Sequence, residues 1–263
     1  MTLKKDDLCF SIITIVYNGE DYITNTIISV INQTYSNIEY IVIDGNSTDQ
    51  TPYIIDKFSG RINRFVSEND NGIYDAMNKG LSFCNGDYVI FMNGGDYFAN
   101  ENVLKDIYNE IVRNKYDIDF IYGDAIITDT YSQTFFKKAR SYKYAWYGMF
   151  TNHQAMIYKH EIIKKYKLKY DISYKISADY KFTLEFLKYS KNIHYLPIPI
   201  CNFSLDGVSN SQKQLGLLEA EKAREEILNY SKFKNYIIRQ MLYLSRFLNE
   251  NLTTLYKFIR YKN

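Results

Sequence analysis

Cysteine is scarce in this chain, and its placement argues against both disulfide bonds and a zinc site. The three cysteines, Cys9, Cys84 and Cys201, are widely spaced, and each stands in an apolar segment. Disulfide frameworks and zinc sites use cysteines in pairs or in closely spaced groups. We therefore expect three buried thiols in a reducing compartment.

Long apolar runs are missing as well. No stretch approaches the roughly 20 apolar residues that a helix needs to cross a bilayer. The apolar run at 10–16 follows two lysines and two aspartates and is too short for the core of a signal peptide. These absences predict a cytoplasmic protein whose contact with a membrane is limited to its surface.

The chain also lacks a strong net charge and two common phosphate-binding motifs. Its formal net charge is only +2, so overall charge does not indicate nucleic acid as a partner. No G-x-G-x-x-G follows the first apolar run, which argues against a dinucleotide site, and the lysine-bearing Walker loop is absent. A nucleotide bound by this chain needs a different kind of site.

The first hundred residues do contain a regular alternation of apolar runs and helical patterns. The run at 10–16 predicts a buried strand, runs at 39–43 and 62–67 predict two further strands, and apolar residues at helical spacing over 20–33 predict a helix. Strands that alternate with helices through short connections are typical of a doubly wound sheet. We expect an α/β fold whose central sheet is mostly parallel and flanked by helices.

The segment 68–98 is the one around which we expect the site to be organised. A buried strand at 87–92 runs directly into Asn93-Gly94-Gly95-Asp96. Glycines let the backbone approach a bound group closely, and ligands of open α/β sheets lie at the carboxyl ends of the strands. Our hypothesis is that Asp96 holds a divalent metal, Mn²⁺ or Mg²⁺, on a nucleotide diphosphate.

Two other strands end in polar residues that should reach the same edge of the sheet. Tyr17 follows the first strand, and Asp44 follows the second. Asp44 has an alternative interpretation as a turn residue at a helix entry, where Ser47 or Thr48 can cap the helix. Its position beside Tyr17 and Asp96 favours contact with a nucleotide.

The second half of the chain continues with less regular signals. A helix is expected at 101–113, and strands are expected at 120–124, 125–128, 134–137 and 153–158. The segment 192–203, which contains two prolines, is expected to be an edge strand or an extended crossing, and a helix should follow at 211–230. His153, alone at a strand start, is more often structural than functional.

A helix from about residue 178, capped by Ser177, places Asp179 in its first turn. A carboxylate there is either simply favoured by the helix dipole or held as a general base facing the cleft. The spacing alone does not decide between these roles.

The last segment, 232–263, is basic and amphipathic. It carries seven Lys or Arg and a single acid, Glu250. Apolar residues recur at helical spacing: Phe233, Ile237, Met241, Leu244, Leu248, Leu252, Leu255 and Ile259. Such a helix can lie in an anionic membrane interface. Alternatively, it packs on its own domain or on a partner chain, for example in a homodimer, with its lysines solvated.

Six blocks of sequence together resemble a known family. SIITIVYNGE, IEYIVIDGNSTDQT, SENDNGIYDAMNKGL, GDYVIFMNGGDYF, NHQAMIY and ISADYKF, in this order, are similar to the inverting family 2 glycosyltransferases with a GT-A fold. More narrowly, they resemble the bacterial subgroup that builds O-antigen, capsule, colanic acid and other exopolysaccharides. The resemblance implies a glycosyltransferase domain over 1–210, with a nucleotide-binding half at 9–98 and an acceptor half at 99–210. The segment 211–263 is then a C-terminal helical extension.

The resemblance also implies roles for individual residues. Asp96 matches the last acid of the family's metal-binding motif, although Gly94 and Gly95 replace the commoner preceding residues, and Asp179 matches the catalytic base. His153 and Gln154 match a pair near the diphosphate or the acceptor. Nucleotide-sugar binding is implied for Thr14, Tyr17, Asp44, Asp70, Asp75, Asn78, Asn93, Gly94 and Gly95.

The implied reaction is transfer of one sugar from a nucleotide sugar, most commonly UDP-linked, to a glycan or a polyprenyl-diphosphate-linked sugar. The Gln-x-x-Arg-Trp element of processive synthases is absent, since the single tryptophan, Trp146, lies in Tyr-Ala-Trp-Tyr. A lipid-linked acceptor in the cytoplasmic leaflet would favour the membrane interpretation of the basic tail. The alternative function is a non-catalytic nucleotide-sugar-binding or scaffold protein on the same fold.

Overall fold

The computed structural model describes residues 8–128, 133–204 and 212–251. Among them, nine strands form one sheet in the order β3-β2-β1-β4-β8-β6-β9-β5, with β7 paired to β6. The strands are β1 (Phe10–Val16), β2 (Ile38–Asp44), β3 (Arg64–Ser67), β4 (Tyr88–Phe91), β5 (Tyr97–Phe98), β6 (Phe120–Thr128), β7 (Thr134–Lys137), β8 (Met156–Lys159) and β9 (Ile193–Ser204).

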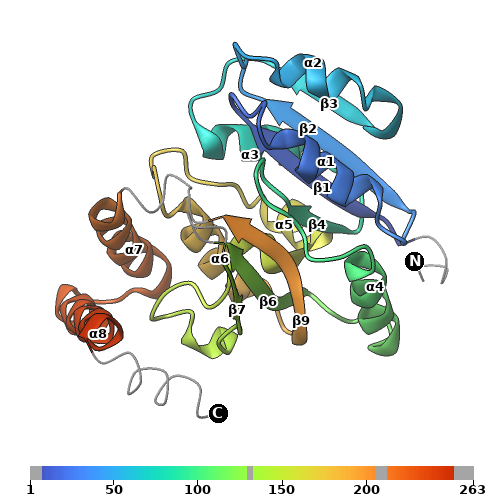
Figure 1. Ribbon diagram of the computed structural model, residues 1–263. Coiled ribbons are helices and arrows are strands. Elements are labelled where there is room, and N and C mark those ends of the chain that lie inside the picture. Colours follow the sequence, from blue (N-terminus) through green and yellow to red (C-terminus); the bar gives the residue numbers. More distant parts are fainter. Residues whose placement is uncertain (1–7, 129–132, 205–211, 252–263) are drawn as a thin grey trace.

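The sheet is parallel in its first half and mixed in its second. β1 runs parallel to both β2 and β4, and β2 runs parallel to β3. β8 joins the two halves by pairing antiparallel with β4 and with β6. The predicted α/β fold with a central sheet and flanking helices is confirmed (Figure 1). The carboxyl ends of β1, β2 and β4 lie at one edge, as the sequence predicts.

Helices cover both faces of the sheet. They are α1 (Ile23–Ile31), α2 (Thr51–Asp56), α3 (Ile73–Phe83), α4 (Val103–Arg113), α5 (His160–Tyr166), α6 (Ala178–Tyr189), α7 (Lys213–Leu228) and α8 (Lys232–Asn251). Alternate residues of a strand point to opposite faces. Ile12 of β1 therefore packs in the core with α1 and α4, while Ile13 packs in the core with α3 and α6. This two-sided burial explains the unbroken apolar run.

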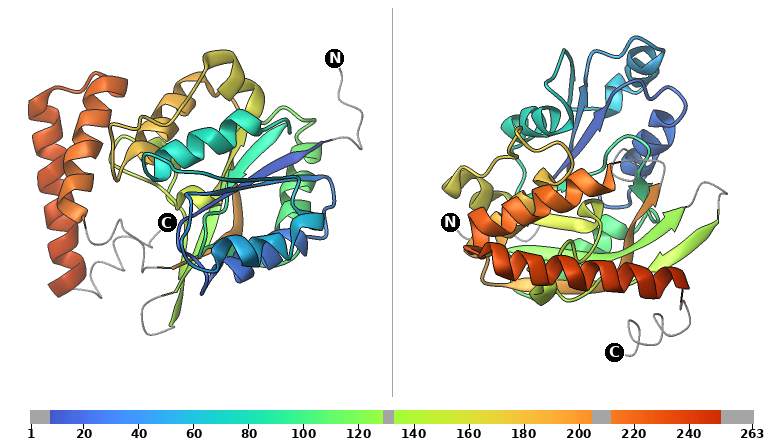
Figure 2. Two further views of the ribbon diagram at one scale, coloured as in Figure 1. Left: turned by 90° about the horizontal axis from the view of Figure 1, so that it is seen from above. Right: turned by 90° about the vertical axis from the view of Figure 1, so that its left-hand side faces the viewer.

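The C-terminal helices form an outer layer on one side of the molecule. α7 packs on α6, and α8 packs on α7, so that the two helices lie side by side (Figure 2). Arg224 of α7 donates from Nε to Asn235 Oδ1 of α8 at 2.8 Å. Within the described ranges, no helix has both the length and the apolar character needed to cross a membrane.

Three local expectations were wrong. β9 lies between β6 and β5 rather than at an edge, because a register shift beside Asp124 accommodates the segment that contains its two prolines. β8 begins at Met156, and the residues before it, His153–Ala155, form a 3-10 turn. The predicted hydroxyl caps are not made: Ser47 bonds to Asp44, and Ser177 donates to the carbonyl of Gly216 at 3.0 Å.

Candidate active site

Turns that follow β1, β2 and β4 meet at the carboxyl edge of the sheet. The N–H of Gly45 donates to the carbonyl of Val16, and the N–H of Gly94 donates to the carbonyl of Ile15, both at 2.9 Å. Gly95 has φ +95°, a conformation that favours glycine. A Cβ on Gly94 would lie 3.1 Å from the Val16 side chain. Gly95 therefore suits the turn that presents Asp96, and a side chain at Gly94 would require the Val16 side chain to shift by a few tenths of an ångström.

Thr26 of helix α1 makes two hydrogen bonds to the backbone of this turn. Its hydroxyl accepts from the N–H of Gly95 at 3.0 Å and donates to the carbonyl of Asp96 at 2.8 Å. The Asp96 side chain is only 6% exposed, and its carboxylate accepts a hydrogen bond from the amide of Gln154. Sequence reasoning missed Thr26, whose only signal was a hydroxyl on the apolar face of a predicted helix.

Asp179 lies in the first turn of α6, as predicted. Its Oδ1 accepts from the N–H of Tyr180 at 2.8 Å. Burial raises the pKa of Asp179 above its ordinary value, and the neighbouring His153 opposes part of that rise. A carboxylate with a raised pKa is a stronger base than one in water, provided that it is ionised.

The start of α6 is fixed by a residue that sequence reasoning also missed. Glu219 of α7 is buried, and its carboxylate accepts from the backbone N–H groups of Lys175, Ile176 and Ser177 at 2.7 to 2.8 Å. The hydroxyl of Tyr74 donates to the carbonyl of Ile176 at 2.6 Å. The backbone that leads into Asp179 is therefore held from α7 and from α3. The only sequence signal for Glu219 was an acid within a helix.

His153 connects Asp179 with the turn after β4. Its Nδ1 lies 3.6 Å from Asp179 Oδ2, and its Nε2 lies 3.0 Å from Asn93 Nδ2. Because the amide of Asn93 donates, Nε2 is the accepting nitrogen, and the ring proton is on Nδ1, facing the carboxylate. Burial lowers the pKa of His153, which keeps the ring neutral at neutral pH.

Two buried amide oxygens in this cluster have no hydrogen-bond partner, namely Asn93 Oδ1 and Gln154 Oε1. A buried acceptor without a partner is costly. Both oxygens belong to residues joined to the cluster around Asp96, and oxygen ligands suit Mg²⁺ and Mn²⁺. In the described part of the chain, no group of three or more His, Cys, Asp or Glu is placed to hold a metal. The cluster fits a cation held by one acid and by neutral oxygens.

At the ends of β1 and β2, Tyr17 and Asp70 come together over Gly45. A Cβ on Gly45 would lie 2.6 Å from Asp70 Oδ2 and 3.4 Å from the Tyr17 ring. The Tyr17 side chain is 60% exposed and can offer its face to a planar group. Asp70 also accepts from the N–H of Gly72 at 2.8 Å, which orders the loop before α3.

Four other predicted residues have bonds within the fold. Buried Thr14 donates to the carbonyl of Met92, and buried Asp44 accepts from Ser47 and from Ser67 Oγ at 2.6 Å. Asp75 accepts from the N–H of Asn71 at 2.9 Å, and Asn78 pairs with both backbone groups of Tyr170 at 2.8 Å. They order the edge and α3, and their contact with a nucleotide sugar stays a prediction.

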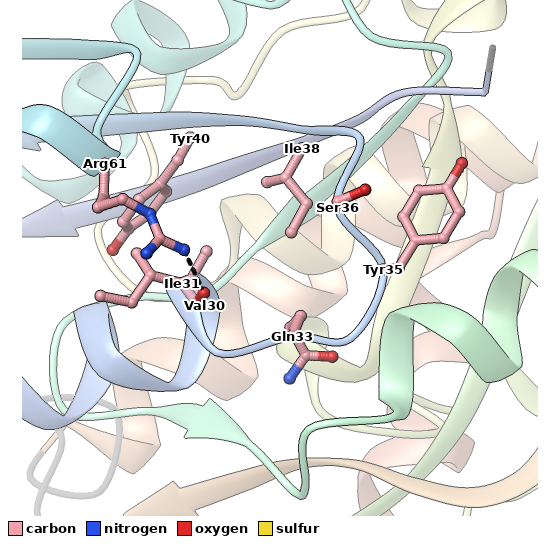
Figure 3. A pocket seen from close by; sticks show the side chains of 8 residues that line it. All are labelled: Val30, Ile31, Gln33, Tyr35, Ser36, Ile38, Tyr40 and Arg61. Carbon is pink, nitrogen blue, oxygen red and sulfur yellow. Dashed lines mark hydrogen bonds between the residues drawn. The ribbon is translucent and has the colours of Figure 1, made fainter.

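Two pockets lie outside this cluster. One of about 160 Å³ lies beside the start of β2, at the opposite end of the sheet, and Arg61 on its wall donates to the carbonyl of Ile31 at 2.8 Å (Figure 3). A smaller one of about 60 Å³ lies between the start of α3 and residues 172–175. It lies between the loop after Asp70 and the segment that precedes Asp179.

Solved structures share this architecture. TarS of S. aureus, in a complex with UDP-GlcNAc, superimposes with a TM-score of 0.68 at 20% identity, covering 96% of this chain and 72% of that chain. A mannosyltransferase of Pyrobaculum calidifontis, in a complex with GDP-Man and Mn²⁺, gives a TM-score of 0.64 at 14% identity, covering 90% and 69%. At such identities the likeness concerns the fold.

Sequence comparison finds glycosyltransferases. An uncharacterized glycosyltransferase of Haemophilus influenzae is 39% identical over 100 residues, 37% of this chain and 40% of that protein. A PGL/p-HBAD biosynthesis glycosyltransferase of Mycobacterium bovis is 25% identical over 217 residues, 77% of this chain and 79% of that protein. The matches to three curated relatives, including the Haemophilus protein, span between 16 and 40% of their length. The model of glycosyl transferase family 2 matches residues 11–171, more than half of the chain, and the chain therefore belongs to that family.

Proposed function

We propose that this protein is an inverting, non-processive glycosyltransferase that moves one sugar from a nucleotide sugar to a hydroxyl of an acceptor. The observation that carries the proposal is the link between two carboxylates. Consecutive residues of one turn bind them: His153 faces Asp179, and Gln154 donates to Asp96. One carboxylate is suited to proton transfer, and the other lies where a diphosphate would leave.

The donor is a nucleoside diphosphate sugar, and UDP is the nucleotide we propose. Tyr17 offers an exposed aromatic ring above Gly45, and Asp70 lies beside it. A planar base can stack on such a ring. The TarS structure that shares this fold holds UDP-GlcNAc, which supports a nucleotide-sugar donor for a site at the same edge.

Asp179 is the general base of the proposed reaction. Its carboxylate takes the proton from an acceptor hydroxyl while that oxygen bonds to the anomeric carbon. The bond between the anomeric carbon and the diphosphate oxygen breaks on the opposite face, and the diphosphate leaves with the electron pair. The configuration at carbon inverts, so an α-linked donor gives a β-glycoside.

His153 and Asn93 position the base. The neutral ring presents its Nδ1 proton to Asp179, and Asn93 holds the other nitrogen at 3.0 Å. At 3.6 Å this contact is electrostatic rather than a hydrogen bond, and a positive group or N–H dipole beside a carboxylate favours its ionised form. The pair therefore orients one oxygen of Asp179 and limits the rise in its pKa that burial causes.

The leaving diphosphate needs a counter-charge, for which Asp96 is suited. Asp96, with the amide oxygens of Asn93 and Gln154, would hold Mn²⁺ or Mg²⁺ at this position. Such an ion, when bound, supplies electrostatic stabilisation of the leaving group. The amide of Gln154 meanwhile keeps the buried carboxylate hydrogen-bonded.

The acceptor we propose is a glycan or a polyprenyl-diphosphate-linked sugar, in the synthesis of a bacterial surface polysaccharide at the cytoplasmic face of the membrane. Six sequence blocks shared with that subgroup support this assignment. The small pocket beside residues 172–175 gives space for a substrate group next to the start of α6.

The proposal is tested by incubating the protein with UDP-sugars, Mn²⁺ and candidate acceptors, and by measuring both transfer and hydrolysis. Wild type is expected to turn over, and Asp179→Asn is expected to lose about 10²- to 10⁴-fold in rate, the usual contribution of a general base. Asp179→Asn should still bind UDP, because its change is confined to the proton acceptor.

The second candidate is a non-catalytic nucleotide-sugar-binding protein on the same fold. The single acid at the metal position favours it. It would show UDP binding by wild type without transfer or hydrolysis of any common donor. Absence of both turnover and nucleotide binding would reject both functions.

A further inference from the structure

Helix α8 exposes a continuous row of large apolar side chains. Exposed fractions between 43 and 73% are found for Phe233, Tyr236, Ile237, Met241, Tyr243, Leu244 and Phe247. At 3.6 residues per turn, these positions fall within about 160° of the helix circumference. We name this row the α8 apolar face; Gln240 is its polar member.

The opposite side of α8 makes the contact with the rest of the protein. Asn235 and Ile238 are buried there, and Asn235 accepts from Arg224 at 2.8 Å. α8 packs on α7, which in turn packs on α6, so α8 is the outer helix of this layer (Figure 2). The helix itself thus packs on its own chain through α7, as one alternative left open by the sequence had it, whereas the apolar row named above is exposed in the described part of the chain.

Charge distinguishes between the partners that remain for this face. From Lys232 to Leu248 the chain contains no acidic residue. Lys234 lies at one margin of the apolar arc, and Lys232 and Arg239 lie at the other, with Arg239 3.6 Å from Glu221. A second copy would therefore offer no acid from this segment to these cations, whereas an anionic surface would.

A lipid surface matches the same arrangement. An amphipathic helix with cations beside its apolar face lies in the plane of an anionic interface, with apolar groups at the acyl boundary. The stems of lysines can follow the apolar surface while their ammonium groups reach the phosphates. Tyr236 and Tyr243, toward the margin of the arc, have an apolar ring and a polar tip, as aromatic residues at membrane interfaces do.

We infer that the α8 apolar face is a docking surface for a membrane with anionic lipid headgroups. The inference stands on the exposed face and its cations and does not depend on the transfer reaction. Binding would hold the molecule by its outermost helix, with α7 between the membrane and α6.

The test is sedimentation of the full chain with vesicles. Two vesicle types are used: phosphatidylcholine alone, and phosphatidylcholine mixed in equal parts with phosphatidylglycerol. We expect binding to the mixed vesicles that weakens as salt is raised. The double variant Ile237→Glu/Leu244→Glu should lose at least about tenfold in partitioning, since it puts two charges into the apolar row. Lys232→Gln and Lys234→Gln should each lose about fivefold on the mixed vesicles.

The matched control is Tyr53→Glu, which places an acid on a 62% exposed side chain of α2, a helix on the opposite face of the sheet. Its partitioning should equal that of wild type. Far-UV melting of each variant shows whether the fold is retained.

Two outcomes would overturn the inference. In the first, the wild-type protein does not bind the mixed vesicles, or its partitioning onto them equals that of the double variant. The other is a concentration-dependent dimer that Ile237→Glu/Leu244→Glu dissociates while wild type shows no vesicle binding, which would assign the face to a second copy of the chain.

Discussion

The imidazole of His153 faces the carboxylate of Asp179, with 3.6 Å between Nδ1 and Oδ2. The next residue along the chain, Gln154, donates to Asp96. A turn of three residues between irregular chain and β8 thus contacts both carboxylates on which the proposed chemistry depends. Any movement of this turn therefore affects the surroundings of Asp179 and Asp96 together.

The half-buried carboxylate of Asp179 should reduce the stability of the native state at neutral pH. Burial raises the pKa of Asp179 in the folded state, so the native state binds a proton more readily than the unfolded chain does. The free energy of unfolding therefore falls as the pH rises from the ordinary pKa of an aspartate to the raised pKa of the folded state. Asp179→Asn should therefore unfold at a higher temperature than wild type at pH 7. The difference in melting temperature between the two proteins should vanish at a pH below 3.8, the ordinary pKa of an aspartate, because Asp179 is then protonated in both the folded and the unfolded state. Calorimetry across this pH range checks it, and a variant less stable than wild type at pH 7 would contradict it.

Replacement of His153 should move the acid limb of the pH–rate profile. His153 lowers the pKa of Asp179, so His153→Phe should raise that pKa further and shift the loss of kcat/KM to higher pH. His153→Asn keeps an N–H donor near Asp179 and should restore part of the wild-type profile. A role of His153 in packing alone would reduce the rate of His153→Phe at every pH and leave the limb in place.

Asp96→Asn should abolish the response to metal. A ligand at about 100 times its Kd stabilises a protein by about 2.7 kcal/mol, so Mn²⁺ with UDP should raise the melting temperature of wild type. Asp96→Asn can still accept from Gln154 but lacks the charge that holds a cation. Asp56→Asn, an exposed acid at the end of α2, is the control and should respond as wild type does. An equal response of Asp96→Asn would place the metal elsewhere.

Glu219→Ala should destabilise the protein by about 3 kcal/mol, because it leaves three backbone N–H groups near the start of α6 without their acceptor. Glu161→Ala removes an exposed acid from α5 and should cost about 0.5 kcal/mol. Urea unfolding of the two variants measures the difference. A loss no larger than that of Glu161→Ala would mean that water replaces the Glu219 bonds.

Gly95→Ala should cost about 1 to 2 kcal/mol, the penalty for an L-residue in left-handed backbone. A Cβ there has its nearest neighbour at 3.6 Å, so the cost is conformational rather than steric. Gly60→Ala is the control, since a Cβ at Gly60 meets no atom within 4 Å and its φ is not positive. Urea unfolding that gave equal stabilities for the two variants would contradict the assigned strain.

Local patterns were sufficient for much of the fold. The β-branched run of β1 is buried on both faces of the sheet. That this segment forms a strand follows from residues that are adjacent in the chain. The meeting of Tyr17, Asp44 and Asp96 at one edge follows from parallel pairing alone, since parallel strands end on the same side. The position of Asp179 in a first turn likewise depends only on its neighbours.

Contacts between distant segments could not be predicted in this way. Two prolines indicated an edge strand, yet β9 lies inside the sheet between β6 and β5, because its pairing with β6 includes a shift in register beside Asp124. The apolar stripe of α8 was visible in the sequence, but its exposure depends on which side packs against α7.

The sequence by itself determined the alternation of strands and helices, and it placed one acid after β4 and another at the start of α6. Hydrophobic periodicity and turn-forming residues are local properties of the chain, so both could be recognised without the structure. Only the tertiary structure decided that Asp96 and Asp179, more than eighty residues apart, are joined through His153 and Gln154. That link requires β8 to insert between β4 and β6, and strand order in a sheet is set by the packing of the whole chain.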